Sequence, residues 1–398
     1  TPGVPVKHLS LATVFAAVSG LVVVWVAGWA LDVETSYRYF LAYWGLFFAC
    51  TGVIDGITHE TTRAVAASRT DGKQGRANPW RLGAALGGVA LALVAVCGLF
   101  FMGAIVPPDP SAATALLAFG LLSYAFQAVL SGVLSGAGLW SRYAALVALD
   151  SGVRLVLALL TLALGGGLRE FLLITVIGAL SWIAILAAAP VRVTLDVDRA
   201  TFVRRVVSAM AASGASAALI TGFPTAVSAA FPDDPETSLT VAAIANAVML
   251  TRAPVLMPLQ RFQSALVVRF VEKRERIYEA LAAPIGAVLT LGVVGFAAAW
   301  LIGPWILRLA FKPELFVAGL TLGLLTFASA FMGMLMITGV AVLALERHAF
   351  YVAGWVIATL TAFAVLFLAP WGVATAVIVA LFAGPIAGAL VHLAGLVR

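Results

Sequence analysis

Runs of hydrophobic residues recur along the whole chain and are separated by short polar connections. Each run is long enough for a helix to cross the hydrocarbon core of a bilayer, which takes about 20 residues. The connections leave no room for an inserted soluble domain of any size. The pattern therefore predicts an all-α polytopic membrane protein with twelve spans, at 9–30, 37–58, 82–106, 112–137, 142–164, 170–190, 204–230, 238–265, 279–302, 315–343, 348–368 and 371–395.

Composition agrees with this prediction. Of the 398 residues, 63% are hydrophobic and only 11% are charged, whereas a soluble domain carries about 25% charged residues. The net charge of +6 is therefore read as a membrane-topology signal, and no nucleic-acid partner is expected. Cys50 and Cys97 both lie inside hydrophobic runs, so they indicate neither a disulfide framework nor a metal site.

Basic residues gather at alternate ends of the predicted spans. If the N-terminus is cytoplasmic, 17 of the 24 Lys and Arg residues fall on the cytoplasmic side and 4 on the outer side. The remaining three, Arg154, Arg252 and Arg261, fall within spans. Because cytoplasmic loops are enriched in Lys and Arg, both termini are predicted to be cytoplasmic.

Two segments of the chain resemble each other. Residues 125–144 and 330–349 share five identical positions at a constant offset of 205, about half the chain length. Transporters are commonly built from such repeats, with the substrate site between them. We therefore predict a six-helix lobe at 1–190, a second at 205–398 and a central cavity. The basic, amphipathic linker at 191–204 is expected either to lie on the inner membrane surface or to form a solvated loop.

Arg252 lies near the middle of the predicted span 238–265. An arginine near the bilayer midplane costs at least about 2.5–3.5 kcal/mol, so it should face a protein interior or a wet cavity. We expect it to contact an anion, with an ion pair to a carboxylate such as Asp55 as the alternative. Pro254 and Pro258 follow closely, and a helix with such prolines is tolerated at membrane depth where it lines a cavity.

Two further polar residues on this span are candidates for substrate binding. Gln263 lies within about 20° of Arg252 on a helical wheel, which allows a polar stripe towards the inner surface. Arg261 lies on the opposite side, and it either contributes to binding or extends to the membrane interface.

A second polar cluster closes the predicted span 37–58. Asp55 and His59 share one helical face, and Asp55 is expected about 5 Å inside the end of the span. It could pair with Arg252, bind a proton or cation, or gate the cavity. Glu60 and Arg63, spaced three residues apart, either bridge each other or form a cytoplasmic gate with His59.

Asp150 and Arg154 are spaced four residues apart in span 142–164. This spacing favours mutual neutralisation within the membrane, and a role in binding a sugar or phosphate is the alternative. The sequence contains no recognisable phosphate loop, nucleophile elbow, metal cluster or pair of catalytic carboxylates, so we predict neither an enzyme nor a bound cofactor.

The chain resembles the polysaccharide and lipid-linked oligosaccharide exporters of the multidrug/oligosaccharidyl-lipid/polysaccharide (MOP) superfamily. The resemblance covers nearly the whole chain, through a polar-ended second span, a glycine-rich fourth span, TRAPVLMPLQ at 251–260 and GPWILRLAFKPELFVAG at 303–319. Phe311, Lys312 and Pro313 replace the glycine-containing turn typical of that family.

This resemblance implies a flippase that works by alternating access in the bacterial plasma membrane. Its substrate would be a polyprenyl-phosphate- or diphosphate-linked sugar for cell-envelope polysaccharide, with Arg252 best placed to hold the phosphate. Glycosyltransferases of the same pathway are the expected protein partners. The alternatives are a cation-coupled multidrug exporter of the same superfamily, and a membrane glycosyltransferase or a structural partner of one.

Overall fold

The computed structural model describes residues 4–72, 75–191, 193–231, 235–345 and 347–397. Within these ranges, the side chains of 4–8, 70–71, 235–236, 257–258, 260–265, 267–268 and 271–272 lie outside the description. The described residues form helices and loops, and they include twelve helical segments long and hydrophobic enough to cross a membrane. The prediction of an all-α, twelve-span membrane protein is confirmed.

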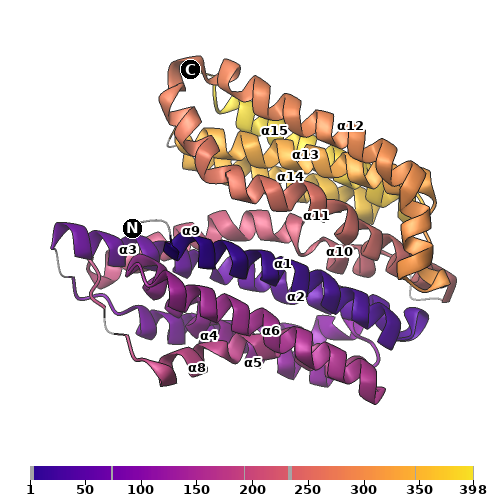
Figure 1. The fold of residues 1–398 in the computed structure, drawn as a ribbon, viewed down its shortest axis with the longest axis horizontal. Coiled ribbons are helices and arrows are strands. Elements are labelled where there is room, and N and C mark those ends of the chain that lie inside the picture. Colours follow the sequence, from indigo (N-terminus) through magenta and orange to yellow (C-terminus); the bar gives the residue numbers. More distant parts are fainter. Residues whose placement is uncertain (1–3, 73–74, 192, 232–234, 346, 398) are drawn as a thin grey trace. The chain divides into compact units, whose positions relative to one another are not determined.

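The first half of the chain forms the helices that Figure 1 colours from indigo to magenta. A π-helical turn, Val33–Tyr37, precedes α2, and a 3-10 turn, Gly178–Leu180, separates α7 from α8. The helices are α1 (Val4–Ala30), α2 (Arg38–Ile54), α3 (Gly56–Asp71), α4 (Pro79–Ile105), α5 (Pro110–Gly136), α6 (Trp140–Leu164), α7 (Leu168–Ile177) and α8 (Ser181–Ala188).

The second half forms the helices coloured from pink to yellow in Figure 1. Short 3-10 turns at Arg274–Arg276 and Pro313–Leu315 precede α12 and α13. The helices are α9 (Arg199–Ile220), α10 (Phe223–Ala230), α11 (Pro235–Glu272), α12 (Ile277–Ala310), α13 (Gly319–Ala344), α14 (His348–Leu368) and α15 (Val373–Ala394).

Two predicted spans differ from the observed helices. The span predicted at 204–230 is two helices, α9 and α10, because the chain turns at Thr221–Gly222 and Pro224 cannot continue the hydrogen bonding of α9. The span predicted at 37–58 continues through α3 to Asp71. Asp55 therefore lies well inside a helical run rather than about 5 Å from its end.

Packing divides the chain into two compact units. Unit 1 comprises Thr1–Asp32 and Ala42–Thr225, and unit 2 comprises Val33–Leu41 and Ala226–Arg398. Helix α9 thus packs with the first half of the chain, and the start of span 2 packs with the second. Because α9 begins at Arg199, the irregular part of the linker is shorter than the predicted 191–204. The predicted division into two six-helix lobes, 1–190 and 205–398, stays a prediction.

The same packing pattern recurs in each unit. In unit 1, α5 packs against α4 and α3, whereas in unit 2, α13 packs against α12 and α11. Small residues allow this close approach: a Cβ at Gly132 of α5 would overlap Thr61 of α3. The repeat therefore extends to the architecture. The end of α5 and the start of α6 recur 208 residues later, as the end of α13 and the start of α14, close to the sequence offset of 205.

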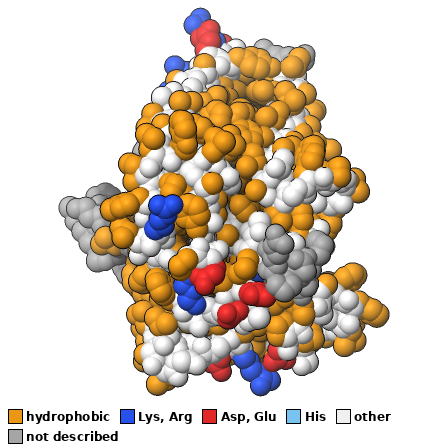
Figure 2. All heavy atoms as spheres, turned by 90° about the vertical axis from the view of Figure 1, so that its right-hand side faces the viewer, with side chains coloured by type: hydrophobic (Ala, Val, Ile, Leu, Met, Phe, Trp, Pro, Cys, Tyr) orange, Lys and Arg blue, Asp and Glu red, His pale blue; other side chains and the backbone are white. Residues whose placement is uncertain are grey.

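The outer faces of several helices carry large hydrophobic side chains. Leu99 on α4 is 82% exposed, and Leu301 on α12 is 72% exposed. Hydrophobic side chains also cover most of the face drawn in Figure 2, where charged side chains are few. Surfaces of this kind on helices of spanning length are those expected to face lipid, and the chain is a multi-pass membrane protein.

The position of His392 near the end of the chain predicts a residue at the membrane interface. The structure corrects this prediction, because His392 lies in the core of unit 2. Its side chain is fully buried; Nδ1 lies 3.0 Å from Thr338 Oγ1, and Nε2 lies 3.1 Å from the Tyr351 carbonyl oxygen. The ring also stacks on Tyr351 at 6.1 Å between centroids. A side chain at Gly354 of α14 would overlap the imidazole, so the absence of a Cβ there is what admits His392.

We expect Gly354→Ala to destabilise unit 2 by about 1–3 kcal/mol, because hydrogen bonds on both ring nitrogens prevent His392 from moving aside. The matched control is Gly286→Ala on α12, where an added Cβ meets nothing within 4 Å. Thermal unfolding of the detergent-solubilised protein should show a lower Tm for the first variant and an unchanged or higher Tm for the second. Equal Tm values for the two variants would refute this packing account.

Candidate substrate site and intramembrane polar network

Arg252 lies near the middle of the 38-residue helix α11, in unit 2. Its side chain is only 6% exposed, and the candidate span Thr237–Leu256 includes it. The helix runs through Pro254 and Pro258 without ending. The side chain is thus buried inside the protein, in agreement with the expectation that it faces a protein interior or a cavity rather than lipid, whereas its contact with an anion stays a prediction.

Other polar groups on α11 are buried as well. Tyr37, in the turn before α2, donates its hydroxyl hydrogen to Asn246 Oδ1 at 2.9 Å, and Thr251 is also buried. The side chains of Arg261 and Gln263, the other two candidates on this helix, lie outside the described residues. Asp55 belongs to unit 1, so its predicted pairing with Arg252 of unit 2 stays a prediction.

Asp150 and Arg154 of α6 form the predicted ion pair, with 2.5 Å between Oδ2 and Nη1. Neighbouring helices complete the pair: Gln127 Nε2 donates to Asp150 Oδ1 at 3.0 Å, and Arg154 Nε donates to the Thr175 carbonyl oxygen at 3.0 Å. The guanidinium also lies 5.3 Å from the ring centroid of Phe48. Each charged group thus has a further partner on a neighbouring helix, which the spacing of Asp150 and Arg154 could not reveal.

Asp55 lies between α2 and α3 and accepts a hydrogen bond of 2.7 Å from the Tyr124 hydroxyl of α5. Tyr124 and Gln127 are three residues apart, so this one helix supplies polar contacts to both Asp55 and Asp150. A line of polar side chains therefore runs through unit 1 from Asp55 to Arg154. Tyr124 and Gln127 were not predicted, because a single polar residue in a hydrophobic helix carries no distinctive spacing.

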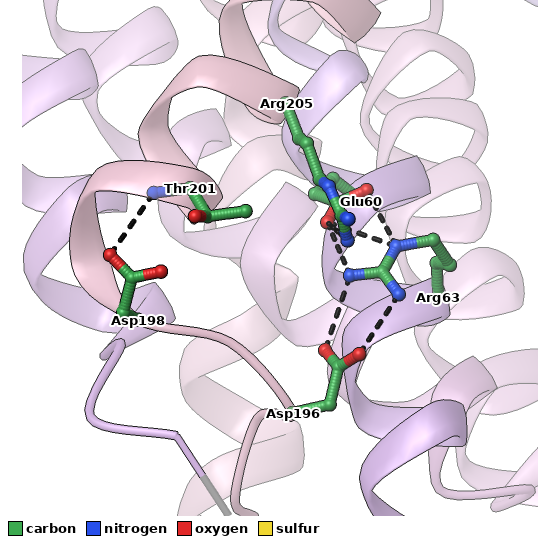
Figure 3. A network of polar contacts seen from close by, with 6 residues as sticks. All are labelled: Glu60, Arg63, Asp196, Asp198, Thr201 and Arg205. Carbon is green, nitrogen blue, oxygen red and sulfur yellow. Dashed lines mark hydrogen bonds and ion pairs between the residues drawn. The ribbon is translucent and has the colours of Figure 1, made fainter.

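Glu60 and Arg63 form an ion pair within α3, which is the first of the two interpretations of their spacing. Arg63 Nη2 lies 2.7 Å from Glu60 Oε1, and Arg63 Nη1 lies 3.1 Å from Asp196 Oδ2 (Figure 3). Arg205 of α9 approaches Glu60 at 3.7 Å. This ion-pair network joins α3, α9 and the segment before α9. His59, the third gate candidate, is exposed, and the ion pairs described for this network do not include it.

Helix α9 begins beside this network at an N-cap formed by Asp198. Its carboxylate accepts a hydrogen bond of 3.0 Å from the backbone nitrogen of Ala200. It accepts a second, of 3.3 Å, from that of Thr201 (Figure 3). The hydrogen bonds from Thr201 and the backbone hold the pKa of the Asp198 carboxyl below its usual value. The cap explains why the helix begins at Arg199, inside the stretch predicted as a linker.

We expect Glu60→Gln to loosen the segment at 193–197, because the carboxylate positions Arg63, which in turn holds Asp196. Because Arg63 is 40% exposed, solvent screens the pair, and we expect its loss to lower the free energy of opening this segment by about 0.3–1 kcal/mol. Tryptic cleavage after Arg199 should then be about two- to fivefold faster. Glu279→Gln, in an exposed pair with Arg276, is the control. Unchanged cleavage in Glu60→Gln would show that the network does not restrain this segment.

Arg38 forms a further buried cluster that the sequence did not indicate. The arginine is 3% exposed; Nη1 donates to Ser238 Oγ at 2.7 Å, and Nε donates to Ser228 Oγ at 3.1 Å. Nη2 donates to the carbonyl oxygens of Ser228 and Phe231. Arg38 is one of the four basic residues that the topology prediction places on the outer side. In the structure it ties the start of α2 to α10 and α11 within unit 2.

Comparison with solved structures defines the class of fold. The chain is similar to an inward-facing multidrug resistance MATE family transporter of the MOP superfamily, with a TM-score of 0.70, 16% identity and coverage of 98% and 97% of the two chains. It is also similar to the lipid II flippase MurJ in an inward closed conformation, with a TM-score of 0.65, 15% identity and coverage of 96% and 86%. The protein has the fold of MOP-superfamily transporters.

Sequence comparison then places the chain in a family. It is 34% identical to Uncharacterized protein Rv3630 of Mycobacterium tuberculosis and to Uncharacterized protein Mb3654 of Mycobacterium bovis, over 99% of this chain and 92% of each relative. It is also 34% identical to Uncharacterized protein Rv1510 of Mycobacterium tuberculosis, over 99% and 91%. No family model matches the chain. The chain belongs to the family of these mycobacterial proteins.

Proposed function

We propose that this protein is a flippase that moves a polyprenyl-phosphate- or diphosphate-linked sugar from the inner to the outer leaflet of a bacterial plasma membrane. The observation that carries the proposal is Arg252, a buried arginine in the middle of α11. The fold is one whose solved examples include the lipid II flippase MurJ, which supports a lipid-linked substrate.

The chemistry of Arg252 supports a phosphate ligand. A guanidinium remains charged inside a protein and presents donors in a planar fork that matches phosphate oxygens. Placing it in a span costs at least about 2.5–3.5 kcal/mol, which a structural role in hydrophobic packing would not require. Arg154 and Arg38 are also buried within candidate spans. Arg154 pairs with Asp150 and the Thr175 carbonyl, and Arg38 donates to Ser228 and Ser238. The position of Arg252 in TRAPVLMPLQ, at 251–260, also supports it as the residue that holds the headgroup, because this segment resembles the lipid-linked oligosaccharide exporters.

The membrane potential supplies a direction for transport. With the cytoplasm negative, moving one negative charge outward is favoured by about 2.3 kcal/mol per 100 mV. An anionic headgroup could thus be exported without an obligatory coupling ion. Both termini would be cytoplasmic, and glycosyltransferases that make or use the same lipid-linked sugar would be the functional partners.

Mass spectrometry of lipids that co-purify with the protein tests this proposal. We expect a polyprenyl-phospho-sugar to co-purify with the wild type and to be depleted in Arg252→Ala. Consistent absence of any polyprenyl lipid from the wild-type preparation, together with drug-stimulated cation flux in vesicles, would overturn the proposal.

Asp55 favours a second candidate function, that of a cation-coupled exporter. Its carboxylate lies inside the helical run of span 2 and is held by the Tyr124 hydroxyl of α5. If a proton or sodium ion binds there and drives transport, Asp55→Asn should abolish the dependence of transport on the ion gradient. If the potential alone drives transport, Asp55→Asn should leave the response to the potential intact. Transport by Asp55→Asn under an imposed potential therefore separates the two candidates.

A further inference from the structure

A cavity of about 450 Å³ opens at the end of unit 1 where α3 approaches the loop between α5 and α6. It lies wholly within unit 1 and contains none of the candidate transport residues. The residues that line it are Val65, Arg69, Ala137, Leu139, Val191, Val193 and Thr194.

One wall of this cavity is the segment before α9, which hydrogen bonds hold in place. The Gly75 nitrogen donates to the Leu195 carbonyl oxygen at 2.6 Å, and the Asp196 nitrogen donates to the Ala64 carbonyl oxygen at 3.3 Å. Backbone hydrogen bonds therefore fix the position of this wall of the cavity.

The lining combines hydrophobic walls with one cation. Five of the lining residues are hydrophobic, Arg69 carries a positive charge, and the lining includes no Asp or Glu among the described residues. Arg69 Nη1 donates to the Gly136 carbonyl oxygen at 3.3 Å, which orients the guanidinium beside the turn at Gly138. Gly138 has a φ of +70°, a conformation that favours glycine. Hydrophobic walls around an exposed cation fit an amphiphile with an anionic head.

The neighbourhood of the cavity points to the membrane interface. Leu139 and Val191 also belong to a hydrophobic cluster with Trp80, Tyr143 and Trp182. Tryptophan and tyrosine concentrate at the level of lipid headgroups. The basic residues at this end are those that the topology prediction places in the cytoplasm, where anionic lipids attract Lys and Arg.

We propose that this cavity binds the head of an anionic phospholipid of the inner leaflet, with Arg69 holding the phosphate and the lipid backbone lying against Val65, Leu139 and Val191. The volume lies within the usual range for ligand sites, about 300–1,000 Å³, and suits a headgroup and glycerol rather than a whole lipid. Bound lipid would hold Val191, Val193 and Thr194 against α3. The site is independent of the proposed transport substrate.

Native mass spectrometry of the protein in detergent tests this proposal. The probes are phosphatidylglycerol, phosphatidylcholine with the same acyl chains, and inorganic phosphate. Wild type should retain phosphatidylglycerol in preference to phosphatidylcholine. Arg69→Gln should bind phosphatidylglycerol about tenfold more weakly, the effect of losing one charge-assisted hydrogen bond. Arg81→Gln, which removes an exposed arginine on α4 that does not line the cavity, is the matched control.

Filling the cavity provides a second variant that keeps the charge. Ala137→Phe should also weaken phosphatidylglycerol binding, although Arg69 is unchanged. Binding that survives in both Arg69→Gln and Ala137→Phe would overturn the proposal, as would equal loss of binding in Arg81→Gln. Competition by inorganic phosphate at the same concentration as the lipid would also overturn it, because it would identify a phosphate site that does not use the hydrophobic walls.

Discussion

Arg252→Ala is expected to reduce flipping of a polyprenyl-phosphate- or diphosphate-linked sugar by about ten- to a hundredfold. Hydrogen bonds to charged groups contribute about 1.5–3 kcal/mol each, and the loss of one from the bound state accounts for a reduction of this size. Because an arginine in a span is itself unfavourable, its removal should leave the protein folded and inserted. The measurement is transport by reconstituted protein whose elution profile and Tm match those of the wild type.

Two controls separate a phosphate contact from a general effect of charge. Arg252→Lys keeps the positive charge but loses the planar fork, so we expect an intermediate transport rate. Arg276→Ala removes an arginine that is 77% exposed and should leave transport unchanged. Full transport by a stably folded Arg252→Ala variant would exclude the phosphate contact.

Arg154→Leu is expected to destabilise unit 1 by about 3–5 kcal/mol, since removing one partner of a buried pair leaves the other charge uncompensated. The side chains of Arg154 and Asp150 are only 5% and 18% exposed. Gln127 continues to donate to Asp150 but cannot neutralise it. Thermal or denaturant unfolding in detergent should therefore show a large loss of stability.

The double variant Asp150→Leu/Arg154→Leu tests the cause of this loss. Replacing both charges with hydrophobic residues is often neutral or stabilising, so we expect the double variant to recover much of the lost stability. If it is instead as unstable as Arg154→Leu, the hydrogen bonds to Gln127 and Thr175 matter more than the uncompensated charge.

Hydropathy predicted the fold well because crossing a bilayer imposes a minimum length on each hydrophobic run. The predicted span 348–368 has the same bounds as α14. Helix ends outside the membrane were less predictable, because hydropathy marks the hydrocarbon region rather than the end of the helix. Helix α11 therefore continues to Glu272, beyond the predicted end at 265.

The polar contacts were predictable only where they are local. The spacings of Asp150 with Arg154 and of Glu60 with Arg63 identified real ion pairs. Their further partners come from distant parts of the chain: Asp196 is 133 residues from Arg63. No periodicity in one sequence encodes such a contact.

His392 was misassigned for a related reason. Its position near the end of the chain suggested an interface, whereas packing around Gly354 places it in the core of unit 2. The close approach of three helices, rather than any local pattern, decides its environment.

Leaflet-to-leaflet movement of a defined substrate in proteoliposomes tests the central claim most directly. The substrate is a polyprenyl-diphosphate-linked sugar, detected at the outer surface by a membrane-impermeant reagent, with a phosphate-free glycolipid of the same chain length as the control. The account predicts that the wild type accelerates movement of the phosphorylated lipid only and that an imposed potential changes its direction. It also predicts that Arg252→Ala reduces the acceleration by about ten- to a hundredfold. Movement of the phosphate-free lipid at the same rate, or no acceleration over protein-free vesicles, would contradict it.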